Sequence, residues 1–159
     1  MFDEYYKKLK DLEQNVPEIF KKVAKKGAIK FVNEAKKRTD TELLFDTGNY
    51  KRNWNAEVIE PLPETYGVQC ENNVEYASFL ENGYTIKKDY FVPFDKMESG
   101  VKTKLFIQQF KAKYPNAKGF IRKAGRYKGK FVGKLALEDA RFYCLEQLED
   151  ALDKAYKQK

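Results

Sequence analysis

Apolar side chains recur along this chain with two different periods, and each period predicts a different kind of element. From Pro17 onward they return every three or four residues, which predicts an amphipathic helix of about 22 residues. A similar stripe over residues 135–156 predicts a second long helix. A short helix is expected over residues 3–14, with Asn15 capping the helix that follows. Residues 96–113 carry a further helical pattern.

The middle of the chain instead alternates apolar and polar residues, which is the period of a half-buried strand. The alternation runs over residues 54–58 and again over 66–70. Two prolines lie within the intervening residues 61–64, and a proline cannot donate to a strand ladder. We therefore expect the chain to turn there and form an antiparallel hairpin. A short helix is expected over residues 76–81, followed by Gly83 in the left-handed position past its end.

Together these elements predict an α+β fold, in which long N-terminal and C-terminal helices pack on a small antiparallel sheet. No linker and no internal repeat divides the sequence, so we expect a single domain over residues 1–159. Within it, residues 84–134 form a basic insertion. Residues 84–94 are expected to form a strand or an extended arm, and residues 114–130 to stay mobile until something binds them.

Charge sets that insertion apart from the rest of the chain. The whole sequence has a formal net charge of +7, but residues 84–134 alone carry 14 Lys or Arg and 3 Asp or Glu. The remaining residues are therefore slightly acidic. Because the charge is concentrated in one segment, that segment should dominate the long-range field of the protein and determine which charged partners approach it.

The sequence offers little for catalysis. It has no histidine, which removes the commonest general base and metal ligand. It has no Cys-x-x-Cys pair and no Gly-x-Ser-x-Gly motif, and the stretch Gly129–Lys134 does not match a phosphate-binding loop. We predict no enzymatic activity, no catalytic residue, no cofactor and no metal site. Cys70 and Cys144 are expected to be free, half-buried thiols, and neither a signal peptide nor a membrane span is expected.

Two motifs in the first half resemble those of a known family. The stretch Asp46-Thr-Gly-Asn-Tyr-Lys-Arg-Asn-Trp54 and the stretch Asn73-Val-Glu-Tyr-Ala-Ser-Phe-Leu-Glu-Asn-Gly83 resemble the paired motifs of a phage tail-component family. This family is typified by gene product ten of phage Hong Kong 97. In the first motif Tyr50 stands where the family usually has leucine, and Asn53 stands where it has serine. The second motif matches more closely, and the resemblance is weak over residues 84–130.

This resemblance implies a structural protein of phage or prophage tail completion or neck assembly. Such a protein would form a homo-oligomeric ring, such as a hexamer, at the end of the tail tube. Its partners would be tail-tube, tail-terminator or neck proteins. It would be made in the host bacterial cytoplasm and would then become part of the virion or of a headless, bacteriocin-like tail particle.

The motif residues are expected to have structural roles. They are Thr47, Gly48, Trp54, Tyr76, Ala77, Glu81 and Gly83. Thr47 and Gly48 should form a turn into the first strand, with Gly48 at positive φ. Trp54 and Tyr76 should anchor the hairpin against the helices. For Glu81 the alternatives are a solvated or N–H-bonded carboxylate, or a salt bridge to Arg52 or to a neighbouring subunit.

The basic insertion supplies the candidate partner interface. Its candidate residues are Lys118, Arg122, Lys123, Arg126, Lys128 and Lys130. They could dock against an acidic neighbouring ring by charge complementarity. The alternative function is nucleic-acid binding by residues 111–134, where aromatic residues that could stack on bases lie between the cations. Those aromatic residues are Tyr114, Phe120, Tyr127 and Phe131.

Overall fold

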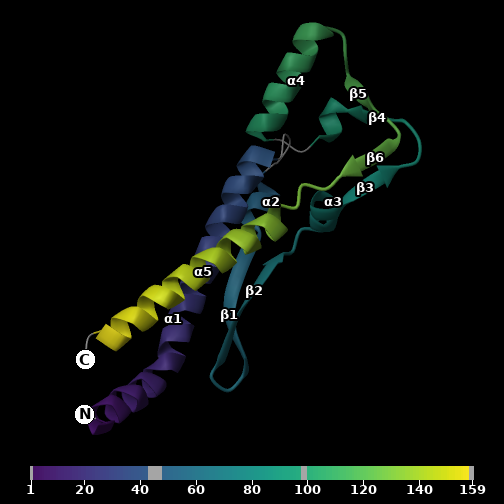
Figure 1. Cartoon of the computed structure of the whole chain (residues 1–159). Coiled ribbons are helices and arrows are strands. Elements are labelled where there is room, and N and C mark those ends of the chain that lie inside the picture. The colour runs from purple at the N-terminus through teal and green to yellow at the C-terminus, as the bar shows by residue number, and fades with distance from the viewer. Residues whose placement is uncertain (1, 43–47, 98–99, 158–159) are drawn as a thin grey trace. The chain divides into compact units, whose positions relative to one another are not determined.

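The computed structural model describes residues 2–42, 48–97 and 100–157 (Figure 1). The helices are α1 (Phe2–Glu42), α2 (Asn49–Arg52), α3 (Ala77–Asn82), α4 (Val101–Lys113) and α5 (Val132–Lys157), with a 3₁₀ turn, η1, over Phe94–Lys96. The strands are β1 (Trp54–Leu62), β2 (Thr65–Asn72), β3 (Gly83–Ile86), β4 (Tyr90–Pro93), β5 (Gly119–Arg122) and β6 (Gly125–Lys128). The predicted α+β class, with its two long helices, is confirmed. The strands form three two-stranded sheets instead of one sheet.

The chain divides into two compact units that are interleaved along the sequence. The helix–hairpin unit consists of Met1–Glu34, Asn55–Glu71 and Leu135–Lys159, and the sheet unit consists of Ala35–Trp54 and Asn72–Lys134. Both α1 and α5 contribute residues to each unit. The expectation of a single domain stays a prediction.

Helix α1 is longer than its pattern predicts. Instead of two helices meeting at Asn15, one helix runs from Phe2 to Glu42 with Pro17 inside it. The side chain of Asn15 donates a 2.7 Å hydrogen bond to the Asp11 carbonyl one turn earlier, so it supports the helix instead of capping a new one. Pro17 lacks an N–H for the Glu13 carbonyl, but Glu13 is exposed, so water can satisfy that group.

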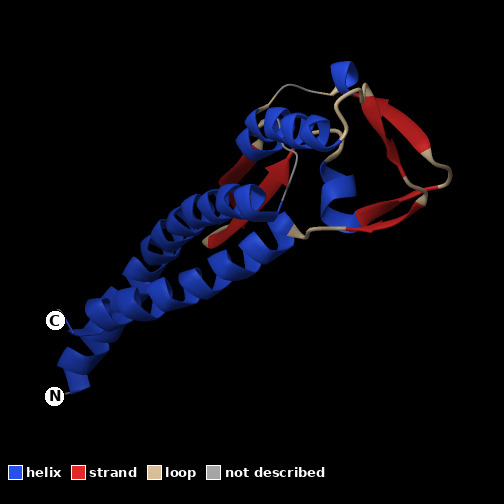
Figure 2. Ribbon diagram, turned by 90° about the horizontal axis from the view of Figure 1, so that it is seen from above, coloured by secondary structure: helices blue, strands red, loops and turns tan. Residues whose placement is uncertain are grey.

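In the helix–hairpin unit, α1 and α5 run antiparallel. Lys26 donates a 2.7 Å hydrogen bond to Gln147, and the ammonium of Lys30 lies 5.7 Å from the centre of the Tyr143 ring. Helix α1 contributes Val23, Ala24, Ala28 and Phe31 to the buried core, and α5 contributes Ala136 and Ala140. A Cβ atom on Gly27 would collide with Cys144 Sγ, so glycine is what allows the helices this close (Figure 2).

The hairpin forms where the prolines predict it. Strands β1 and β2 pair with each other, and a two-residue connection can join only antiparallel neighbours. Strand β1 continues through Pro61 to Leu62, so the turn falls on Pro63 and Glu64. Glu64 adopts φ of 58°, and the carboxylate of Glu60 accepts a 3.1 Å hydrogen bond from its N–H.

In the sheet unit, the basic segment that was expected to be mobile is folded. Residues 119–122 form β5 against β4, and residues 125–128 form β6 against β3, both antiparallel. Helix α4 covers β5, with Phe106 and Phe110 packed on Phe120 at ring-centre distances of 5.4 and 6.3 Å. The expectation of mobility is therefore wrong for these strands, because aromatic packing and pairing with earlier strands offset the charge and the glycines.

Candidate assembly sites

The two family motifs meet at one carboxylate. Tyr50 is fully buried, and its hydroxyl donates a 2.6 Å hydrogen bond to Glu81 Oε1. The backbone N–H of Gly133, at the start of α5, donates a 2.8 Å hydrogen bond to the same oxygen. Half-buried Glu81 is thus an N–H-bonded carboxylate, one of the alternatives predicted for it. It joins three segments that lie far apart in the sequence.

Trp54 lies in a site that gives its indole both a hydrogen-bond acceptor and an aromatic neighbour. Its indole N–H donates a 3.2 Å hydrogen bond to the hydroxyl of Thr39, which is fully buried and donates a 2.8 Å hydrogen bond to the Ala35 carbonyl. Tyr50 packs edge-on against Trp54 at 5.1 Å between ring centres. A hydroxyl suits this position because it can accept a hydrogen bond from one group and donate to another at once.

Several other motif residues surround this cluster. Tyr76 stacks on Tyr50 at 6.4 Å between ring centres, and the Asn72 side chain donates a 2.7 Å hydrogen bond to the Tyr50 carbonyl. Gly48 has φ of 84°, as predicted for the turn, whereas Thr47 lies outside the described residues. Sequence reasoning missed Tyr50 itself. A signal was present, because Tyr50 places an aromatic ring and a hydroxyl where the resemblance leads one to expect leucine.

Backbone N–H groups from much later in the sequence cap the C-terminal end of α3. The N–H of Lys130 bonds the Leu80 carbonyl at 2.7 Å, and the N–H of Phe131 bonds the Glu81 carbonyl at 3.3 Å. These carbonyls have no partner within the helix. Gly83 follows with φ of 81° and ψ of 179°, a conformation that glycine alone adopts readily. Ala77 begins the helix, and its N–H bonds the Val74 carbonyl at 2.8 Å.

Two of the six candidate interface cations are engaged within the sheet unit. The guanidinium of Arg122 lies 5.3 Å from the Tyr84 ring centre and 5.1 Å from that of Tyr127, and it also bonds the Tyr84 hydroxyl. Lys123 forms a 2.8 Å ion pair with Asp89. The hydrogen bond from Lys123 lowers the pKa of the Asp89 carboxyl below its usual value. Arg122 therefore helps to join β5 to the β3–β6 pair.

The other four cations are exposed. They are Lys118, Arg126, Lys128 and Lys130, and their side chains make no hydrogen bond or ion pair with the residues that the structure describes. Arg126 and Lys128 lie two positions apart on β6, so they share one face of the β3–β6 pair, and Tyr127 lies on the opposite face. We call these four residues the cationic surface.

Three of the four aromatic residues considered for base stacking pack against another ring. Phe120 lies against α4, and Tyr127 stacks on Tyr84 with 5.1 Å between ring centres and 9° between ring planes. Tyr114 is exposed but lies 5.0 Å from Phe110 between ring centres, and Phe131 is exposed. This arrangement weakens the case for an extended stacking platform, because the bases of a single strand need several free rings in sequence.

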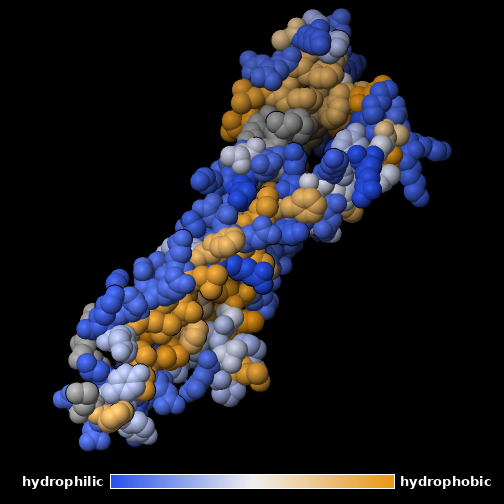
Figure 3. Space-filling model, viewed as in Figure 1, coloured by the Kyte–Doolittle hydropathy of each residue, from blue (hydrophilic) through white to orange (hydrophobic). Residues whose placement is uncertain are grey.

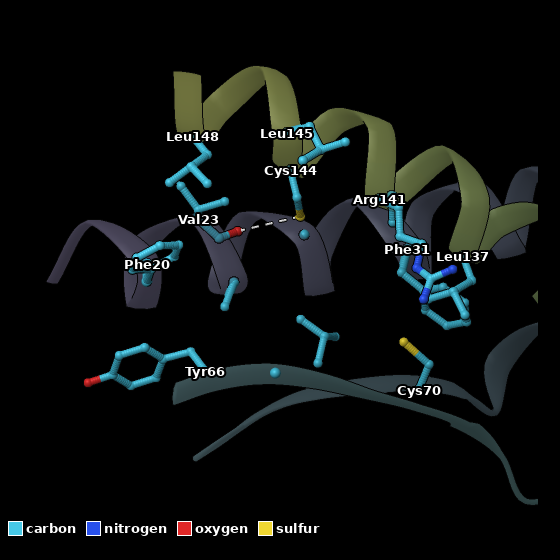
Figure 4. Close-up of a pocket in the computed structure, with 15 residues that line it drawn as sticks. Phe20, Val23, Phe31, Tyr66, Cys70, Leu137, Arg141, Cys144, Leu145 and Leu148 are labelled. Atoms are coloured by element: carbon cyan, nitrogen blue, oxygen red, sulfur yellow. Dashed lines mark hydrogen bonds between the residues drawn. The ribbon is translucent and has the colours of Figure 1, made fainter. Parts of the chain in front are cut away.

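The helix–hairpin unit contains an apolar groove of about 580 Å³ between its helices and β2 (Figure 4). Its lining residues are Phe20, Val23, Ala24, Gly27, Phe31, Tyr66, Gly67, Val68, Cys70, Leu137, Ala140, Arg141, Cys144, Leu145 and Leu148. Arg141 is the charged member of this set. Hydrophobic side chains are visible at the surface of the same unit in Figure 3. An apolar groove of this size is suited to receiving side chains from another molecule.

Both cysteines line this groove as free, half-buried thiols, as predicted. Burial raises the pKa of the Cys70 thiol to about 11, and burial also raises that of Cys144. Within the described part of the chain, no cluster of three or more His, Cys, Asp or Glu could hold a metal ion. None of the described helices combines the length and the apolar character needed to cross a membrane.

Comparison with known proteins agrees with the motifs. No curated protein and no solved structure matches the chain significantly. A model of the family described as "Bacteriophage HK97-gp10, putative tail-component" matches residues 3–83, about half of the chain. The matched region contains Tyr50, Trp54, Tyr76 and Glu81, the residues that form the cluster. The chain therefore belongs to the HK97 gp10-like family of phage tail components.

Proposed function

We propose that this protein completes the phage tail by forming a ring of identical subunits where the tail tube meets the neck. The observation that carries the proposal is the cationic surface, which is displayed on folded strands and their flanking loops in a chain of a tail-component family. A ring that joins two other rings needs one surface for its own copies and another for its neighbours. The cationic surface is suited to the second role.

Electrostatics explains why these residues suit a docking role. Lys118, Arg126, Lys128 and Lys130 are exposed, so their charges remain available to a partner. Complementary charge mainly speeds association and fixes register, and its effect weakens with salt. The partner would be an acidic surface of a tail-tube, tail-terminator or neck protein. The assembled ring would belong to a virion or to a headless tail particle.

The first experiment measures the mass of the purified chain in solution by light scattering, with and without co-expressed tail-tube and neck proteins of the same particle. Negative-stain images of the same samples would show whether rings form. We expect rings in at least the co-expressed sample. A chain that remains monomeric in both samples and binds none of these proteins would overturn the proposal.

A charge-reversal variant tests the cationic surface itself. The four substitutions are Lys118→Glu, Arg126→Glu, Lys128→Glu and Lys130→Glu. The matched control reverses four exposed lysines elsewhere, namely Lys22, Lys25, Lys37 and Lys154, and changes the net charge equally. We expect the first variant to form its own ring but lose partner binding, and the control to keep both. Equal loss in both variants would show that only total charge matters.

Nucleic-acid binding remains the second candidate, and the same variants test it. Labelled single-stranded and duplex DNA are titrated with the wild-type chain at about 50 mM and at about 200 mM salt. Binding that falls steeply with salt and disappears in the cationic-surface variant would favour nucleic acid as the partner. We expect only weak binding, because Phe120 and Tyr127 are committed to packing. We also predict that the chain has no enzymatic activity.

A further inference from the structure

The first part of α1 has an apolar stripe that no described residue of its own unit covers. No side chain over residues 2–22 is buried, and Val23 is the first core residue. Phe2, Tyr6 and Leu9 are 89%, 71% and 41% exposed, and Tyr5 beside them is 53% exposed. Positions i, i+3, i+4 and i+7 share one face of a helix, so these four side chains form a continuous stripe. We call it the N-terminal stripe.

Among the described residues of the same unit, no element covers the apolar groove. Leu145 lines it and is 58% exposed, and Phe20 lines it and is 39% exposed. Large apolar side chains left at a groove in this way mark an interaction site more often than chance exposure. The occupant must supply apolar side chains, and a carboxylate near Arg141 would complement the charged lining residue (Figure 4).

The N-terminal stripe has the chemistry that the groove requires. Three of its four residues are aromatic, and the first turn of α1 carries Asp3 and Glu4. A helix that places anchors at i, i+4 and i+7 into an apolar groove is a recurrent mode of protein recognition. The acids lie only at the N-terminal end of the stripe, where Asp3 could pair with Arg141, and Lys7, Lys8 and Lys10 follow them along the helix.

The stripe cannot enter the groove of its own chain. Helix α1 is continuous from Phe2 to Glu42, and its residues Phe20–Phe31 form one wall of the groove. Tyr6 therefore lies about 25 Å along the helix axis from Val23, at the 1.5 Å rise of an α-helix. A stripe that occupies the groove must therefore belong to another copy of the chain.

We propose that the N-terminal stripe of one copy docks into the apolar groove of the next copy. Donor and acceptor are different surfaces of the same chain, so the contact is head-to-tail and repeats around a ring until it closes. The inference rests on the proposed ring and names the contact that holds it together. It assigns this contact to the helix–hairpin unit and leaves the cationic surface of the sheet unit for the neighbouring ring.

Three variants of the full chain test the contact. The stripe variant carries Phe2→Ser and Tyr6→Ser, and the groove variant carries Leu145→Glu. The control is Ile29→Ser, because Ile29 lies on the same helix α1, is 64% exposed and does not line the groove. Circular dichroism checks that each is folded. We expect light scattering to show unchanged assembly for the control and a self-association Kd raised roughly 100-fold for the other two.

Mixing the stripe and groove variants tests the proposed contact more directly than either variant alone. The stripe variant retains a groove and the groove variant retains a stripe, so the mixture should form a 1:1 pair that cannot grow further. Rings formed by either variant alone, or two monomers that fail to pair on mixing, would overturn the docking mode while the wild-type ring stands. A wild-type chain that never assembles would instead overturn the ring itself, and this contact with it.

Discussion

The hydroxyl of Tyr50 donates a 2.6 Å hydrogen bond to the carboxylate of Glu81, and this bond joins the two motifs that identify the family. Withdrawing a carboxylate from water is unfavourable unless its oxygens are satisfied, and the N–H groups of Gly133 and Lys134 provide further donors at 2.8 and 3.4 Å. The pair explains how a carboxylate is accommodated beside the aromatic rings of the cluster. It also makes the cluster sensitive to small substitutions.

Removal of the Tyr50 hydroxyl should show how strongly the stability of the cluster depends on this hydrogen bond. Tyr50→Phe deletes the donor but keeps the ring against Trp54, and a hydrogen bond to a charged group contributes about 1.5–3 kcal/mol. We expect the free energy of unfolding to fall by that amount in urea titrations. Tyr76→Phe is the control, since the Tyr76 hydroxyl makes no hydrogen bond with the described residues. Equal effects of the two substitutions would contradict a special role for Tyr50.

Gly133 should not tolerate even a methyl group. A Cβ atom there would lie 2.6 Å from Trp54 Cη2, and the indole is buried and cannot move aside cheaply. Alanine would gain at most about 1 kcal/mol of helix propensity, whereas overpacking typically costs about 1–3 kcal/mol. We therefore expect Gly133→Ala to lower the melting temperature. Gly67→Ala, whose new Cβ would lie 3.4 Å from Ile59, should change it little.

Arg122 should behave as a structural residue, unlike the neighbouring cations. Arg122→Lys keeps the charge but removes the planar guanidinium that packs on Tyr84 and Tyr127, an interaction of about 1–2 kcal/mol. We expect hydrogen exchange of the β3–β6 amides to become faster by roughly 10-fold. Lys128→Ala should leave exchange unchanged. Protection that is unaltered by Arg122→Lys would show that the sheets hold together without it.

The cysteines should react slowly in the native protein. The thiolate is the reactive species, and burial raises the pKa of Cys70 to about 11 from an ordinary value of 9.0. At pH 8 the thiolate fraction of Cys70 is then roughly 100-fold below that of an unfolded cysteine. Iodoacetamide labelling followed by mass spectrometry should modify Cys70 slowly in buffer and rapidly in denaturant. Equal rates in both conditions would contradict its burial.

The same shift predicts a dependence of stability on pH. Because the pKa of Cys70 is higher in the folded state, its neutral thiol favours folding, and this contribution is complete below pH 9.0. It is lost as the pH rises from 9.0 to about 11, because the unfolded chain ionises first. Cys70→Ser lacks this titration. Its free energy of unfolding should therefore fall less steeply over that window than that of the wild-type chain.

The features that sequence predicted correctly depend on local patterns. The long amphipathic helices follow from the three- and four-residue spacing of their apolar side chains, and the hairpin follows from alternation interrupted by prolines. Gly83 has the positive φ expected after a short helix, but its ψ of 179° places it outside the predicted left-handed helical region. Free, half-buried cysteines follow from their positions on an alternating strand and an apolar helical stripe.

The features that sequence reasoning missed depend on distant residues. Pro17 resembles a helix start, and only the continuation of the stripe on both sides allows one helix to pass through it. Strands β5 and β6 are short and basic, and their pairing with β4 and β3 has no local signal. The hydrogen-bond partners of Glu81 lie 31 and 52 residues away in the sequence. Local patterns could therefore limit its role to a few alternatives but could not identify these partners.

The closure of α3 by residues 130 and 131 has a consequence during synthesis. A nascent chain that has just exposed Gly83 outside the ribosome contains every position that the family model matches. It still lacks the N–H groups that close the end of α3 and the glycine that contacts the Glu81 carboxylate. Residues 3–83 should therefore not complete their folding until about fifty further residues have been translated. A fragment ending at residue 83 is then a poor candidate for expression on its own.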